Sequence, residues 1–171
     1  MKKYEFTGET KEIRLLFRTA TLHRIRATVA FGIVEVGDLG GWIEKEENLS
    51  HEGKAWVCGD AEVWGNAEVW GNAKVCGDAK VCGDAEVFSA SHVLVIGAIG
   101  SRNDFTTFYR DKDNEITVKC GCFLGKIDRF LEKVTQTHGD SKYALVYRAA
   151  VEVAKLQIDL SGEAPKDADE E

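Results

Sequence analysis

The chain has little proline and no long hydrophobic run, and each shortage excludes a class of protein. Pro165 is the only proline among 171 residues, which excludes collagen-like and proline-rich chains. No apolar run approaches the ~20 residues that a membrane-spanning helix needs. The opening MKKYEFTGETK has basic residues but no apolar stretch behind them, so we expect no secretory signal. Hydrophobic residues make up 44% and charged residues 30%, which is typical of a globular protein.

The five cysteines indicate neither a disulfide scaffold nor a metal site. Without a secretory signal we expect a cytoplasmic protein whose five thiols are reduced. Cys120-Gly121-Cys122 is spaced too closely for the usual zinc chelate, and no second Cys or His pair follows at zinc spacing. We therefore expect no metal and no other cofactor.

Charge is unevenly distributed along the chain. The formal net charge is −7, yet residues 1–31 contain seven basic and three acidic residues. The overall negative charge argues against general binding to duplex DNA, which depends on neutralising phosphates. A local basic region that includes Arg18, Arg24 and Arg26 remains compatible with one anionic ligand or partner. The same arginines are equally compatible with solvated strand edges.

An internal repeat occupies the middle of the chain. From Ala55 the sequence reads AWVCGD, AEVWGN, AEVWGN, AKVCGD, AKVCGD and AEVFSA, so Ala-x-Val recurs six times with a period of six residues. This period does not match the 3.6 residues of a helical turn, whereas alternating Ala and Val suit one face of a strand. Gly-Asp or Gly-Asn closes five of the units, and these residue types tolerate positive φ at sharp corners. The repeat therefore predicts short strands joined by tight corners.

Two architectures fit such strands: an antiparallel meander and a β-helix. A meander of four-residue strands would place every Ala and Val on one face of a ribbon too small to be stable alone. A β-helix encloses the same residues in its own core. We favour the β-helix.

The repeat resembles the hexapeptide repeat of left-handed parallel β-helix proteins, with an aliphatic residue followed four positions later by a small one, as in Val57 and Ala61. The stretches GDLGGWIE at 37–44, NLS at 48–50 and GKAWV at 53–57 resemble uncharacterised hexapeptide-repeat proteins found in bacterial genomes and often in phages or prophages. The broader family implies a triangular prism with about 18 residues per coil, and frequent trimers.

On this basis we predict a mainly β fold built around a short left-handed parallel β-helix over residues 49–96. An N-terminal β cap and the loop into the repeat would occupy 1–48, and a small α+β module of a hairpin and two helices would occupy 97–158. Residues 159–171 are predicted to be an acidic disordered tail. Within the flanks, the apolar patterns favour strands at Tyr4–Thr7, Ile13–Arg18, Thr21–Ala27 and Ile33–Val36, a hairpin of Phe105–Tyr109 and Glu115–Cys120, and helices at Asp128–Thr137 and after Asp140 or Ser141.

If three hexads make one coil, residues 18 apart stack on one another. Cys58 then lies beside Cys76, Glu62 beside Lys80 and Glu68 beside Glu86. Large aromatic side chains in the same register point outward and need a cover, either another segment of the chain or another subunit. We predict a homo-oligomer, with a trimer favoured, whose interface contains Trp64, Trp70 and Phe88.

The strongest constellation outside the repeat is a polar turn led by Gly100. Its short side chains and one arginine can present several hydrogen-bond donors to a carboxylate or phosphate. The alternative is a loop whose polar groups satisfy only the local backbone. Basic groups of the two helices could line a cleft between this module and the β-helix. The predicted ligand-binding residues are Ser101, Arg102, Asn103, Thr106 and Thr107, with His138, Arg148, Arg18, Arg24 and Arg26.

These patterns predict a non-catalytic, oligomeric binding protein that captures a small anionic, nucleotide-type ligand or a host protein. The phage-like resemblance adds a counter-defence role in the host cytoplasm as one form of this hypothesis. A CoA-dependent acyltransferase is the first alternative, because hexapeptide-repeat enzymes often use a histidine as general base. A purely structural assembly module is the second. No catalytic residue is predicted.

Overall fold

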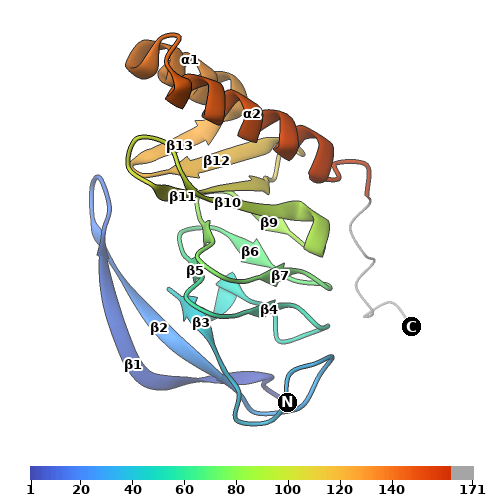
Figure 1. The fold of residues 1–171 in the computed structure, drawn as a ribbon. Coiled ribbons are helices and arrows are strands. Elements are labelled where there is room, and N and C mark those ends of the chain that lie inside the picture. Colours follow the sequence, from blue (N-terminus) through green and yellow to red (C-terminus); the bar gives the residue numbers. More distant parts are fainter. Residues whose placement is uncertain (163–171) are drawn as a thin grey trace.

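Strands dominate the chain as far as Lys126, and two helices follow (Figure 1). The computed structural model describes residues 1–162. The N-terminal strands are β1 (Tyr4–Arg14), β2 (Thr19–Ala27) and β3 (Leu39–Ile43). Six two-residue strands come from the repeat: β4 (Trp56–Val57), β5 (Glu62–Val63), β6 (Glu68–Val69), β7 (Lys74–Val75), β8 (Lys80–Val81) and β9 (Glu86–Val87). The C-terminal elements are β10 (Val93–Ile99), β11 (Asp104–Arg110), β12 (Ile116–Cys120), β13 (Phe123–Lys126), α1 (Ile127–His138) and α2 (Lys142–Gln157).

The predicted fold class, a left-handed parallel β-helix, is wrong. The strands form four separate sheets: a mixed sheet in the order β1-β2-β3-β5-β8, an antiparallel sheet β10-β11-β12-β13, and the pairs β4-β7 and β6-β9. None of these sheets closes on itself or continues as a solenoid. Each repeat strand is only two residues long and has a single repeat-strand partner, so the longer antiparallel strands on either side make up most of the sheet structure.

Within the repeat, the expected offset of 18 residues is confirmed. Val57 pairs with Val75, Val63 with Val81 and Val69 with Val87, each in a parallel pair. The Ala and Val side chains of the six Ala-x-Val units are buried, with at most 2% of their surface exposed. We call residues 55–90 the hexad stack. Its core consists of small and β-branched side chains because the six-residue period returns them to the same face.

The first two strands form a long hairpin that runs beside the hexad stack (Figure 1). Strand β2 joins β3, and β3 in turn pairs with β5. Leu22 of this hairpin packs in a cluster with Trp42, Trp64 and Cys82. One side of the hexad stack is thus covered by the same chain. The predicted strand boundaries need correction: residues 15–18 are outside β1 and β2, and 33–36 contribute only the isolated bridge between Phe31 and Val34.

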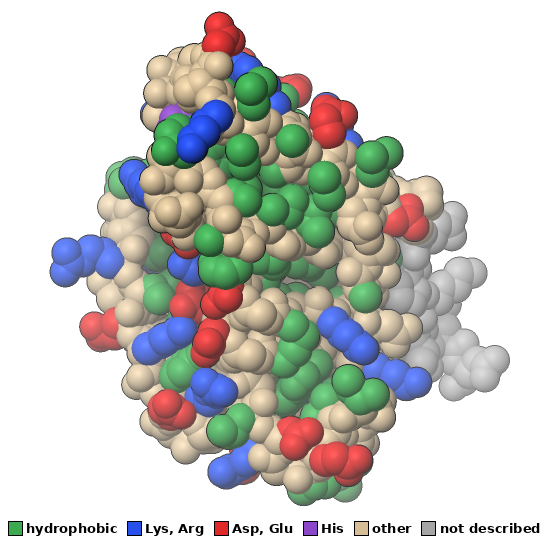
Figure 2. Space-filling view, viewed as in Figure 1, with side chains coloured by type: hydrophobic (Ala, Val, Ile, Leu, Met, Phe, Trp, Pro, Cys, Tyr) green, Lys and Arg blue, Asp and Glu red, His purple; other side chains and the backbone are tan. Residues whose placement is uncertain are grey.

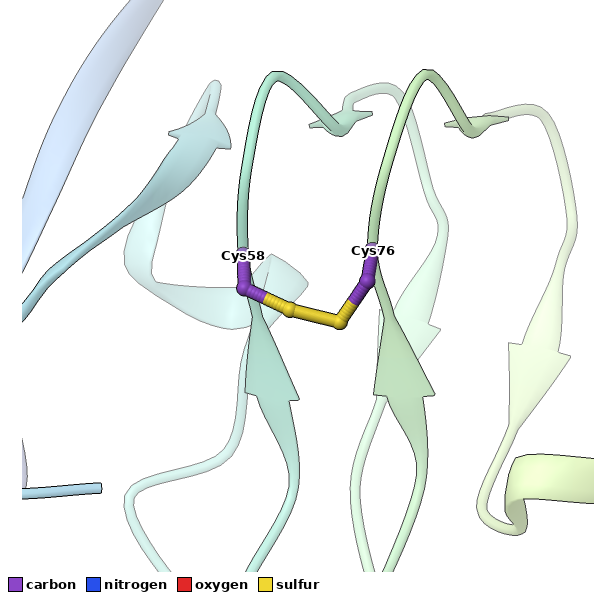
Figure 3. Close-up of a disulfide and its surroundings, with 2 residues drawn as sticks. All are labelled: Cys58 and Cys76. Carbon is purple, nitrogen blue, oxygen red and sulfur yellow. A yellow bond between two sulfur atoms is a disulfide. The ribbon is translucent and has the colours of Figure 1, made fainter. Parts of the chain in front are cut away.

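A disulfide joins Cys58 and Cys76, which directly follow β4 and β7 (Figure 3). Their Cα atoms are 4.6 Å apart, about the spacing of neighbouring strands. The 18-residue offset therefore brings the two thiols side by side. The expectation of five reduced cysteines is wrong for this pair, whereas Cys82, Cys120 and Cys122 are free.

The C-terminal sheet lies at one end of the hexad stack, and α1 and α2 pack on its outer face (Figure 1). Both predicted helices are present; the first is observed at Ile127–His138. Phe108 and Val118 of the sheet pack against Phe130 of α1 and Val151 of α2. Within residues 1–162, no helix is both long and apolar enough to cross a membrane. Most of the predicted tail, residues 163–171 of 159–171, lies outside the described residues.

Candidate anion-binding site

A small cavity of about 160 Å³ opens in the C-terminal module, between two β turns and the helices. The β10–β11 turn contributes Ser101, Arg102 and the adjacent Asp104. The β12–β13 turn contributes residues 120–123. The helices supply the remaining lining residues, Phe130, Lys133, Val134, Thr137 and His138 of α1 and Tyr147 of α2. We call this cavity the anion pocket.

Gly100 determines how closely the first turn approaches the helices. Its φ is +76°, and a Cβ at this position would overlap the phenol oxygen of Tyr147. Only glycine therefore lets the turn fit against α2 without displacement. This close approach places Ser101 and Arg102 at the mouth of the pocket.

The second turn has a glycine for a related reason. Gly121 has a φ of +55°, and an added Cβ would lie 3.3 Å from Nη1 of Arg102. The guanidinium group thus lies close to the backbone of the neighbouring hairpin. No hydrogen bond or ion pair engages this guanidinium within residues 1–162, so its donors are available to a ligand.

Helix α1 contributes both the basic groups and part of the floor. Lys133 and His138 lie on the pocket side of the helix, and Phe130 and Val134 are buried beneath them. The ring of His138 stacks on that of Tyr147, with centroids 5.7 Å apart. The Phe130 and Tyr147 rings meet edge to face at 5.7 Å. Contacts between aromatic rings therefore hold the floor of the pocket in place beside the basic groups.

The formal charge of the pocket lining, within residues 1–162, is positive even when His138 is left out. Arg102 and Lys133 face one carboxylate, Asp104. Burial raises the pKa of the Tyr147 phenol, and the neighbouring Cys120 thiol raises it further. The phenol is therefore protonated at neutral pH and can donate a hydrogen bond to an anion.

Three of the predicted ligand-binding residues, Ser101, Arg102 and His138, meet in this pocket. Asn103 belongs to the same turn, with φ +48°, but does not line the cavity. Thr106 and Thr107 are buried in β11 and do not line it. The Thr106 hydroxyl donates to Sγ of Cys120 at 3.4 Å, and that of Thr107 accepts from the Lys80 backbone N–H at 3.0 Å. Their hydroxyls therefore have structural partners.

The other predicted arginines lie elsewhere and have partners of their own. Arg18 forms a bidentate pair with Glu44, and Arg26 pairs with Glu5 at 2.7 Å. Arg24 lies over the indole of Trp42, with 5.2 Å from Cζ to the ring centroid. Arg148 donates to the hydroxyl of Thr135 and the carbonyl of Gly139. The cleft expected between the module and the repeat is not where the pocket lies, because no hexad residue lines it.

Lys133, Tyr147 and Cys122 line the pocket, although no sequence pattern indicated them as ligand-binding residues. Lys133 looks like an ordinary exposed residue of an amphipathic helix, and Tyr147 belongs to the apolar stripe of α2. One signal was available for Lys133: it lies four residues before Thr137 in the predicted helix, so these two side chains share one side of it. The identity of the opposite wall depends on how the helices pack on the sheet.

The aromatic residues predicted to form a subunit interface are largely covered within the chain. Trp64 and Phe88 are each only 5% exposed. Trp64 packs beneath the N-terminal hairpin, and Phe88 packs against Trp70 and His92, with centroid distances of 4.8 and 4.4 Å. The homo-oligomer remains a prediction, but these side chains mainly serve the fold of one chain.

Within residues 1–162, no cluster of three or more His, Cys, Asp or Glu side chains is placed to hold a metal ion. In comparisons with known proteins, no family model matches the chain and no curated protein is significantly similar to it.

Proposed function

We propose that the protein binds a small anionic ligand through the anion pocket and does not transform it. The observation that carries this proposal is the convergence of Arg102, Lys133 and His138 on one cavity whose floor is aromatic. Guanidinium and ammonium groups form charge-assisted hydrogen bonds with phosphate and carboxylate oxygens, and these are the stronger hydrogen bonds in proteins. An apolar floor beside the cations strengthens such contacts by lowering the local dielectric constant.

The size of the cavity limits what it holds. A volume of about 160 Å³ corresponds to roughly five liquid water molecules at ~30 Å³ each. Pockets that enclose drug-sized ligands measure about 300–1,000 Å³. A phosphate or carboxylate group therefore fits, whereas a whole nucleotide would leave its sugar and base outside. For a nucleotide-type ligand, we propose that the phosphate end enters the pocket.

We propose that the protein acts in the cytoplasm. If it is a phage-encoded counter-defence factor, this is the cytoplasm of the host cell. Reducing conditions there would open Cys58–Cys76 to two thiols. The anion pocket contains neither cysteine, so its binding does not require the disulfide. No specific observation favours the acyltransferase or the assembly module over ligand binding.

Calorimetric titration with inorganic phosphate and with adenosine monophosphate tests the proposal. We expect both to bind, and expect Arg102→Gln and Lys133→Gln each to weaken binding about tenfold, because a hydrogen bond to a charged group contributes roughly 1.5–3 kcal/mol. Arg129→Gln is the matched control, since Arg129 is an exposed cation of α1 outside the pocket. Binding that is equally strong in all three variants would contradict the proposal, and heat with acetyl-CoA alone would favour the acyltransferase.

A further inference from the structure

A second and larger hollow lies on the hexad stack, remote in sequence from the anion pocket and sharing no lining residue with it. It measures about 660 Å³, which is within the usual range for ligand sites. Its floor comes from β4, β7 and the residues beside them. Its wall consists of residues 31–34 and 38, from the segment between β2 and β3, and of residue 39 at the start of β3. We call it the stack groove.

The 18-residue offset arranges the floor in levels. Trp56 lies beside Lys74, and the Cys58–Cys76 disulfide follows on the same side. Lys54, Asn72 and Ala90 are spaced by the same 18 residues and line the groove as well. Outward-facing side chains from successive levels thus form one continuous surface.

Apolar side chains on the wall are left uncovered. Ile33 is 83% exposed and Leu39 is 54% exposed. The wall is braced where Phe31 meets Trp56 edge to face, with ring centroids 5.3 Å apart. Hydrophobic side chains gather over the region of β4 and β7 on this face, with Lys or Arg side chains at their edge (Figure 2). Exposed apolar surface at a concave site is typical of a place where something binds.

The polar groups of the stack groove are mainly cationic. Lys54 and Lys74 both line it, and neither forms an ion pair with any residue from 1 to 162. Among residues 1–162, Asp38 is the one carboxylate that lines the groove, and its Oδ2 already accepts a hydrogen bond from the Glu35 backbone N–H at 2.9 Å. Two lysines without partners beside an apolar wall complement a molecule that is apolar along most of its length and negatively charged at one end.

We propose that the stack groove binds amphipathic anions of the aliphatic carboxylate type. The chain of such a ligand would lie against Phe31, Ile33 and Leu39, and its carboxylate would meet Lys54 and Lys74. The apolar contact contributes through burial of surface, whereas the lysines select for negative charge. This site is independent of the anion pocket and of the function proposed for it.

Titration with laurate, followed by calorimetry and by displacement of the fluorescent anion anilinonaphthalene sulfonate, tests this site. The double variant Lys54→Gln, Lys74→Gln should bind laurate at least tenfold more weakly than the native chain and should bind uncharged dodecanol equally well. Ile33→Ser with Leu39→Ser should weaken binding of both ligands. Because all four side chains are exposed or at the rim, we expect unchanged thermal unfolding in these variants. Arg129→Gln, which changes an exposed cation of α1 outside both sites, is the control and should leave laurate binding unchanged.

Three results would overturn the proposal. The first is laurate binding that is insensitive to the double lysine change. The second is a dimer in light scattering that Ile33→Ser dissociates, because the groove would then be an interface between two copies. The third is much tighter laurate binding by a chain ending at Gly162, because the acidic residues 163–171 would then be the occupant.

Discussion

Lys3 is a cation held inside the protein by backbone oxygens. It is 3% exposed, and its Nζ donates to the carbonyls of Ala55 at 2.7 Å and Glu52 at 3.3 Å. The same nitrogen lies 4.9 Å from the centroid of the Phe31 ring. Burial lowers the pKa of Lys3 from 10.5 to about 8, and the nearby charge of Glu52 only partly opposes this shift.

The lowered pKa predicts a specific dependence of stability on pH. Between about pH 8 and pH 10.5 the unfolded chain keeps the proton of Lys3 that the folded chain has released, so the free energy of unfolding should rise with pH. Relative to Lys3→Met, which does not titrate, the native chain should gain up to about 1.4 kcal/mol per pH unit in that window. Urea denaturation at pH 7, 8.5 and 9.5 measures the difference. Parallel curves for the two proteins would show that Lys3 titrates normally in the folded state.

For single residues, the sequence predicted which side chains are buried better than it predicted which side chains line the pocket. The Ala and Val of the six Ala-x-Val units are buried because a six-residue period is an even number, so each unit presents the same face. Arg102 could be selected from the sequence because a glycine-led polar turn is a local feature, and it lines the pocket. Lys133 and Tyr147 were missed because their meeting depends on helix packing. Thr106 and Thr107 do not line the pocket because this part of β11 is buried between the helices and the hexad stack.

Among the elements, β4 and β7 are each followed directly by a cysteine, and these two form the one disulfide of the described residues, Cys58–Cys76 (Figure 3). The link closes a segment with a sequence separation of 18, which restricts the unfolded chain. In the chain-entropy description, a loop of about this length contributes roughly 3 kcal/mol. The strands themselves are only two residues long, so this contribution is large relative to their own pairing.

We therefore expect the double variant Cys58→Ser, Cys76→Ser to unfold at a temperature several degrees lower than the oxidised native chain. Adding a reducing agent should lower the midpoint of the native chain to a similar value and should leave the variant unchanged. Scanning calorimetry with and without the reductant makes the comparison. Equal midpoints in all four samples would mean that the disulfide does not stabilise the fold.

The elements also show where local patterns stop being informative. The helices were predicted because their apolar spacing is a property of the helix alone, and Gly139 ends α1 as expected. The 18-residue offset followed from the six-residue period together with the three units per coil that the resemblance to hexapeptide-repeat proteins implies. The four-sheet organisation did not, because β2, β3 and β5 join one sheet through contacts between segments far apart in sequence. The strand predicted at 33–36 failed because its apolar side chains, including Ile33 and Val36, remain exposed.

For the whole molecule, the N-terminal hairpin and the C-terminal module cover surfaces of the hexad stack that would otherwise need a partner. Tyr109 of β11 donates its hydroxyl hydrogen to the carbonyl of Cys82 at 2.8 Å, and the Lys112 N–H donates to the carbonyl of Asp84 at 2.9 Å. Leu22 packs on Trp64 from the other segment. Both flanks are thus part of one folded unit with the stack.

This arrangement predicts that the outward aromatic residues control stability of the single chain. Trp64→Ser and Phe88→Ser should each lower the free energy of unfolding by about 3–5 kcal/mol, the usual cost of removing a buried aromatic side chain. Trp70→Ser, at a half-buried position, should cost less and is the control. Chemical denaturation measures stability, and light scattering measures mass. Unchanged stability with a loss of subunits would instead place these residues at an interface between chains.

The most direct test of anion capture is to see the anion. Crystals of the protein soaked in selenate, a heavier analogue of sulfate and phosphate, should show an anomalous peak between Arg102, Lys133 and His138. The peak should disappear in crystals of Arg102→Gln. Strong peaks elsewhere on the surface, with none in the anion pocket of the native protein, would contradict the proposed binding function.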